Sequence, residues 1–177
     1  MVPTLDGAGL FDGCWASPWT AAAFALFAGV LIVLSVIDLR DHRLPRCIVV
    51  PVTGASLALF GGAAITGGEA RALARALVCA LAAGLVFLAL HVASPRGMGF
   101  GDVRLAGLIG LDLGWLGVEV ACAGLGLGVA SAAAFSALVV VTGTRSRHDA
   151  IPLGPFLAGG ALVAMAAGTR VAATWSG

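Results

Sequence analysis

The sequence predicts an all-α protein: a polytopic membrane bundle of about six transmembrane helices. Composition is the first reason, because 60% of the 177 residues are hydrophobic and only 11% are charged. Mean hydropathy is +1.05, whereas soluble domains are about 45–50% apolar and about 25% charged. The second reason is pattern. The apolar residues form continuous runs without the alternation that a membrane-spanning β-barrel needs, so helices are the structure that satisfies the backbone in lipid.

Six apolar runs define the expected helices. A helix crosses the hydrocarbon core with about 20 mostly apolar residues. The runs cover residues 19–37, 48–66, 72–92, 103–115, 117–141 and 152–173. The fourth run is short and interrupted by glycines, which leaves it either a tilted or shortened span or a partly buried helix. We therefore expect one membrane-embedded domain over residues 19–173, after a short extracytoplasmic segment of residues 1–18.

The small residues, the start of the chain and the cysteines add three expectations. The glycine-rich and alanine-rich stretch 124–134 predicts close helix packing, since small side chains let helix backbones approach one another in a membrane. No Lys or Arg precedes the first apolar run, so the segment lacks the start of a cleavable signal peptide and the first helix is expected to remain. The four cysteines stand singly, without the paired spacing of a zinc or redox site, and packing is their expected role.

The arginines predict the orientation, because the chain has no lysine and cytoplasmic loops are enriched in Lys and Arg. An N-terminus outside the cell places three arginines outside, namely Arg71, Arg75 and Arg170. The other seven then lie inside, namely Arg40, Arg43, Arg46, Arg96, Arg104, Arg145 and Arg147. This topology predicts an inner (cytoplasmic) membrane protein whose most polar loops face the cytoplasm.

Two aspartates at membrane edges are the candidate functional residues. Asp38 stands where the first apolar run stops and Asp102 where the fourth begins, so antiparallel helices bring both carboxylates to one depth. Each alone is equally well explained as a charged helix end, with Asp102 favoured by the helix dipole. Gly99 and Gly101 shift the balance, because glycine allows backbone conformations and close approaches that an extended substrate beside the site would need.

Facing carboxylates have a specific chemistry. Two close together cannot both ionise easily, so one keeps a proton while the other acts as a base. A water molecule between them can then attack an amide carbonyl, with the proton finally passing to the leaving nitrogen. The residues alone therefore point to hydrolysis by an aspartate pair.

Three stretches resemble the type IV prepilin peptidases, which are GxGD-type intramembrane aspartic proteases. The sequence IDLRDHRLP resembles the first catalytic region, with Asp38 followed at the family spacing by Leu44 and Pro45. The sequence GFGDVRLAGLIG carries the G-x-G-D motif with Gly99, Gly101 and Asp102. A late helix start, IPLGPFLAGG, supplies the possible supporting residues Pro152, Gly154 and Pro155. Together the three stretches cover nearly the whole chain.

The resemblance implies a function and a partner. Asp38 and Asp102 would be catalytic, no metal or other cofactor would be needed, and the substrate would be a prepilin or pseudopilin precursor with a short basic leader before a hydrophobic helix. Arg46 and Arg104 depart from the residues usual in the family. About 18 residues precede the first helix, so the resemblance is to the short form without the paired-cysteine methyltransferase region, like the peptidases of Flp or Tad-type pili. Methylation is accordingly not expected.

Other acidic residues and the lone histidine have simpler interpretations. Asp41 is the rival of Asp38, but it stands among basic residues where a solvated ion pair accounts for it. Asp112 and Glu119 fall at the opposite membrane face, where we expect charges of short loops. His91, near the end of the third run, is expected to be an interfacial or hydrogen-bonded residue without a functional role.

Two other classes of function remain. A small proton- or ion-coupled carrier would use the same aspartates, yet carriers favour mid-membrane carboxylates and repeated halves, and the sequence shows no internal repeat. A noncatalytic assembly subunit would explain the small-residue helices and leave both aspartate motifs unused. A phosphate-binding loop is not indicated, since the glycines at 97, 99 and 101 lack the strand and fingerprint of a dinucleotide site, and nucleic acid is not an expected partner. We expect membrane lipid to surround the helices. The sequence does not predict the oligomeric state.

Overall fold

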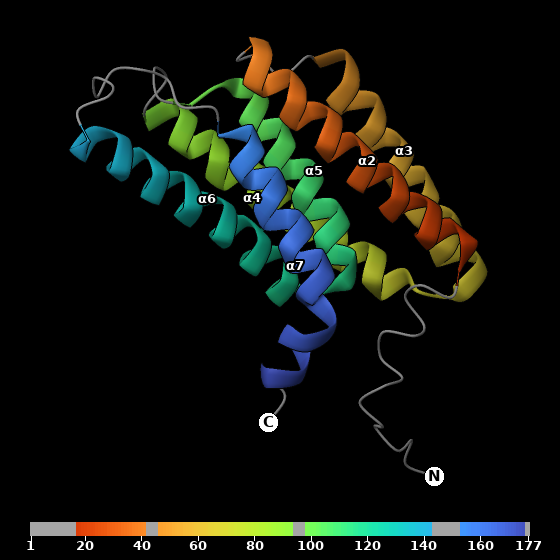
Figure 1. The fold of residues 1–177 in the computed structure, drawn as a ribbon. Helices are drawn as coiled ribbons and strands as arrows, with labels where there is room; N and C mark the ends of the chain where they lie inside the picture. Colours follow the sequence, from red (N-terminus) through yellow and green to blue (C-terminus); the bar gives the residue numbers. More distant parts are fainter. Residues whose placement is uncertain (1–16, 42–45, 94–97, 143–152, 176–177) are drawn as a thin grey trace.

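A computed structural model describes residues 17–41, 46–93, 98–142 and 153–175 of the chain. Over these residues the protein consists of six helices and contains no strand, which confirms the all-α class (Figure 1). The helices are α2 (Pro18–Asp41), α3 (Arg46–Gly67), α4 (Ala70–Ala93), α5 (Phe100–Leu116), α6 (Val118–Val141) and α7 (Gly154–Trp175). Each expected apolar run lies on its own helix.

Proline and glycine mark two of the helix boundaries. Pro18 opens α2, where its missing N–H is no loss because the first backbone amides of a helix have no intrahelical partner. Between α3 and α4, Gly68 has φ of +72°, a left-handed conformation that favours glycine and ends helices. The chain therefore reverses sharply at this turn.

Four of the helices are long and apolar enough to cross a membrane, namely α2, α3, α4 and α6, among the residues that the structure describes. Residues 154–167 of α7 form a shorter apolar helix. Many large apolar side chains on the bundle exterior are exposed, as for Ile65 at 85% and Val92 at 70%. Such a surface is unfavourable in water and favourable in lipid, so the fold is a helical membrane bundle.

Helix α5 is the centre of the bundle. It packs against each of α2, α3, α4, α6 and α7, and most of its residues are buried, including Leu105, Leu108 and Ile109 at 0% exposure. Its 17 residues span only about 26 Å. Of the two alternatives for the fourth run, the structure selects the buried helix, since neighbouring helices rather than lipid cover it.

Glycines let the helices approach closely. A Cβ added to Gly110 would lie 2.6 Å from the Cys79 carbonyl oxygen of α4, so α4 and α5 are in near backbone contact. Likewise Gly128 of α6 and Gly160 of α7 leave no room for a side chain between these two helices, and a side chain at Gly124 of α6 would overlap Leu113 of α5. The packing role predicted for the stretch 124–134 is thus confirmed at Gly124 and Gly128.

The sequence-based expectation for Asp112 is wrong. Asp112 does not belong to a short loop: α5 continues to Leu116, and Asp112 is fully buried inside the bundle. Its Oδ1 accepts a hydrogen bond of 3.3 Å from the Ser56 hydroxyl of α3. This hydrogen bond satisfies part of the buried carboxyl group. Glu119, in contrast, is exposed in the first turn of α6, as expected of a charge at a turn.

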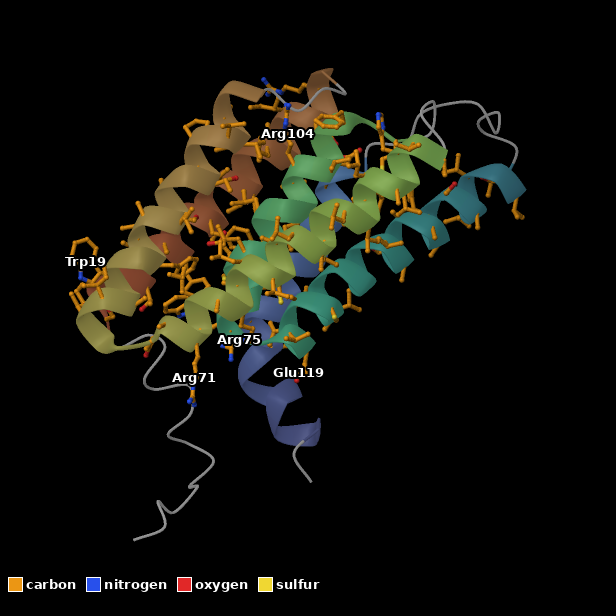
Figure 2. All side chains as sticks on the ribbon, turned by 180° about the vertical axis from the view of Figure 1, so that it is seen from behind. Trp19, Arg71, Arg75, Arg104 and Glu119 are labelled. Atoms are coloured by element: carbon orange, nitrogen blue, oxygen red, sulfur yellow. The ribbon has the colours of Figure 1, made fainter. Side chains whose placement is uncertain are left out.

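The two ends of the bundle carry different arginines. Arg104 lies at one end, whereas Arg71, Arg75 and Glu119 lie at the other (Figure 2). Arg75 donates hydrogen bonds to the Gly114 carbonyl at 2.9 Å and to the Trp115 carbonyl. A cation at these carbonyls satisfies groups that have no intrahelical partner and complements the negative end of the α5 dipole. The structure thus separates Arg104 from Arg71 and Arg75 by bundle end (Figure 2), and which end faces the cytoplasm stays a prediction.

Candidate active site

The candidate site lies where four helix ends meet. The C-terminal ends of α2 and α4 and the N-terminal ends of α5 and α7 are at the same end of the bundle (Figure 1). Alternating chain direction causes this, since every second turn of an antiparallel bundle returns to one side. Residues far apart in the sequence are thereby brought together at one end.

Asp38 sits in the last turn of α2 and is only 5% exposed. Its Oδ2 accepts a hydrogen bond of 3.2 Å from the backbone N–H of Gly154, the first residue of α7. A Cβ on Gly154 would lie 2.6 Å from that same oxygen. The carboxylate therefore rests directly on the positive N-terminal end of α7, where an anion is favoured.

Asp102 sits in the first turn of α5 and is 8% exposed. Its Oδ2 accepts a hydrogen bond of 3.2 Å from the backbone N–H of Gly99, and its own N–H donates to the Gly99 carbonyl at 3.1 Å. This reciprocal arrangement at the start of a helix caps α5. Capping fixes the Asp102 side chain at the helix end.

The two carboxyl groups lie at the same end of the bundle, in the last turn of α2 and the first turn of α5, and the charge of Asp38 acts on Asp102. Burial is the main reason that the pKa of Asp102 rises from its ordinary value of 3.8 to about 6. The negative charge of Asp38 is the second cause of the increase. The Gly99 hydrogen bond and His91 oppose the increase in pKa. Two buried carboxyl groups that repel one another favour a state with a single shared proton.

The structure changes the role of the site glycines. Gly99 has φ of −73° and ψ of 148°, an extended conformation that any residue adopts, and Gly101 belongs to the first turn of α5. Backbone freedom is therefore not what Gly99 supplies, contrary to our expectation. Gly99 is exposed beside the Asp102 carboxyl group, so open space for a substrate remains the prediction for these positions.

His91 is a residue whose position sequence reasoning did not connect with the site. At the end of α4, its Nδ1 lies 2.8 Å from the Met98 carbonyl oxygen, and its ring packs edge-on against Phe100 with centroids 5.6 Å apart. Phe100 in turn lies beneath the Arg104 guanidinium, 4.8 Å from the ring centroid. The expected hydrogen-bonded state is confirmed, and its partner is the residue immediately before the G-x-G-D motif.

Several predicted site residues lie outside the described residues, namely Leu44, Pro45 and Pro152. Asp41 ends α2, but its side chain also lies outside the described part of the chain. Pro155 is the second residue of α7, a position that tolerates proline. Among the described residues, no three His, Cys, Asp or Glu side chains gather as metal ligands.

Fold and site together define a helical membrane protein with a buried aspartate pair at one end of the bundle. The chain matches the model of the Type IV leader peptidase family over residues 25–144. It belongs to this family. With its apolar helices, this makes it a multi-pass protein of the inner membrane.

Curated relatives carry the name prepilin leader peptidase/N-methyltransferase. One from Aeromonas salmonicida (strain A449) is 31% identical over 145 residues, covering 79% of this chain and 47% of the relative. One from Burkholderia pseudomallei (strain K96243) is 31% identical over 155 residues, covering 84% of this chain and 47% of the relative. The chain thus spans about half the length of the curated relatives it matches. No solved structure matches the chain.

Proposed function

We propose that the protein is an intramembrane aspartic endopeptidase that removes the leader peptide from type IV pilin-like precursors. The observation that carries the proposal is the pairing of Asp38 and Asp102, two buried carboxyl groups from α2 and α5 at one end of the bundle. Family membership supports the same activity, since the relatives are named for it. Among such precursors, those of Flp or Tad-type pili are the substrates we propose, as the resemblance to the peptidases of these pili implies.

In the proposed reaction, the carboxyl groups of Asp38 and Asp102 together carry one proton before the substrate is cleaved. Asp102, whose pKa is raised to about 6, holds it and hydrogen-bonds the substrate carbonyl oxygen. Asp38, stabilised as an anion by the Gly154 N–H, takes a proton from water while the water oxygen bonds to the carbonyl carbon. The C–N bond then breaks, and the leaving nitrogen receives a proton from the carboxyl pair.

The proposed location of cleavage is the cytoplasmic face of the membrane. The site occupies the bundle end that carries Arg104, and Lys and Arg are enriched on the cytoplasmic side. A precursor with a basic leader would keep that leader in the cytoplasm while its hydrophobic helix lies along the bundle. The scissile bond would then meet the carboxyl pair at the edge of the membrane, where water is available.

A carrier remains the alternative, but the geometry does not favour it. Asp38 and Asp102 lie in the last and first turns of their helices rather than at mid-membrane, where carriers place their coupling sites. Co-expression with candidate prepilins, followed by mass spectrometry of their N-termini, tests the proposal. Precursors whose leader remains attached in the presence of the folded, inserted protein would rule the proposal out for those substrates, and proton-coupled uptake dependent on both aspartates would favour the carrier.

A further inference from the structure

A single peptide group joins His91 to Asp102. The peptide between Met98 and Gly99 has its carbonyl oxygen 2.8 Å from His91 Nδ1, and its N–H donates to Asp102 Oδ2 at 3.2 Å. A carbonyl oxygen only accepts, so Nδ1 must carry the hydrogen and donate it. His91 and Asp102 therefore hold opposite ends of the same peptide.

Because a peptide group is planar, this link couples the orientations of its two hydrogen bonds. The six atoms of a peptide group lie in a plane, so the direction of the carbonyl sets the direction of the N–H. A hydrogen bond from α4 to the carbonyl thus aims the Gly99 N–H at the carboxyl group on α5. Hydrogen bonds in such a chain also polarise one another, which strengthens each of them.

We propose that His91 is a positioning residue for Asp102: its Nδ1–H holds the Met98–Gly99 peptide so that the Gly99 N–H stays directed at the carboxyl group. The ring contact between His91 and Phe100 keeps the imidazole in place for this bond. The groups whose charges act on Asp102 are Asp38 of α2 and His91 of α4. His91 thereby sets the orientation of the N–H group that faces the Asp102 carboxyl group. The catalytic consequence rests on the proposed peptidase function.

Two substitutions separate the hydrogen bond from the ring. His91→Asn keeps a donor nitrogen at the same number of bonds from Cα as Nδ1 and removes the ring. His91→Phe keeps an aromatic ring for Phe100 and removes the donor. Loss of one hydrogen bond that orients a reacting group should lower kcat in His91→Phe by about tenfold, with KM changed by less than about twofold. His91→Asn should stay within about threefold of the wild-type kcat.

An activity-independent measurement accompanies the kinetics. Hydrogen exchange of the Gly99 amide, followed by NMR in detergent micelles, should be faster in His91→Phe than in wild type and near wild type in His91→Asn. Thermal unfolding of both variants should show that each remains folded.

The outcomes distinguish the two proposals. Wild-type kcat in His91→Phe, equal loss in His91→Asn and His91→Phe, or unchanged Gly99 exchange would each overturn the positioning role. If the wild-type protein cleaves no prepilin while Gly99 exchange responds as expected, the structural link stands and the peptidase proposal fails.

Discussion

The backbone N–H of Gly154 donates a hydrogen bond of 3.2 Å to Oδ2 of Asp38, which lies 116 residues earlier in the chain. The bond ties the last turn of α2 to the first residue of α7. Because Gly154 has no side chain, the helix end can approach the carboxylate closely enough for its amide to donate. This contact gives a physical reason why the start of α7 would matter to a site whose two aspartates lie on α2 and α5.

Gly154→Ala should therefore damage the site. Its Cβ would lie 2.6 Å from Oδ2 and 3.1 Å from Cγ of Asp38, so either the carboxylate or α7 must move. Misplacing a reacting group by about 1 Å can cost about a hundredfold in rate, and we expect a loss of that order in leader removal. The rate with a purified prepilin and the unfolding temperature measure the two effects.

Gly159→Ala is the matched control, because a Cβ there meets nothing within 4 Å on the same helix. It should cleave at the wild-type rate. Equal rates for Gly154→Ala and Gly159→Ala would show that the contact with Asp38 is not needed for activity.

Removal of either carboxyl group should abolish cleavage. Asp38→Asn and Asp102→Asn leave the side-chain shape nearly unchanged, but an amide can neither accept the proton of water nor share one. We expect each to lower the rate by about a thousandfold or more, with membrane insertion retained. Asp41→Asn should remain active in the same assay. An inactive Asp41→Asn beside an active Asp38→Asn would assign the first catalytic position to Asp41.

The raised pKa of Asp102 predicts how activity depends on pH. Asp102 keeps its proton below about pH 6 and loses it above that value, so the pair becomes doubly ionised as pH rises. The rate of leader removal should then fall on the alkaline side with an apparent pKa near 6. A rate that rises through this range would contradict a mechanism that needs one shared proton.

Stability should change with pH in the same direction. Since the folded pKa of Asp102 lies above its ordinary value of 3.8, the contribution of this group is fully present below about pH 4 and is lost as pH rises through about 6. Asp102→Asn removes that dependence. The unfolding temperature of Asp102→Asn relative to wild type should therefore be higher at about pH 8 than at about pH 4.

Gly101→Val tests whether the space beside Asp102 serves the substrate. Gly101 is the second residue of α5, and a β-branched residue there is compatible with a helix, so the main effect of valine is bulk. We expect strongly reduced cleavage in a protein that still inserts normally. Gly126→Val on α6, where a Cβ meets nothing within 4 Å, controls for adding valine to a membrane helix. Wild-type cleavage by Gly101→Val would remove the substrate-space argument.

Much of the fold could be predicted because it follows from the chemistry of single segments. An apolar run of about 20 residues must satisfy its backbone within lipid, and this alone predicts helices and their number. Alternation of direction then places Asp38, at the end of the first helix, on the same side as Asp102, at the start of the fourth. The candidate pair thus needed no tertiary information beyond chain direction.

What the sequence by itself determined was the helical membrane class, the approximate extents of the helices and the shared end of the two aspartates. Only the tertiary structure decided that α5 is central, that Asp112 is buried against Ser56, that Gly154 contacts Asp38 and that His91 reaches Met98. Each of these depends on how a helix is rotated and which neighbour it meets. Lipid and protein core are both apolar, so runs that are hydrophobic on every side do not reveal which face turns inward.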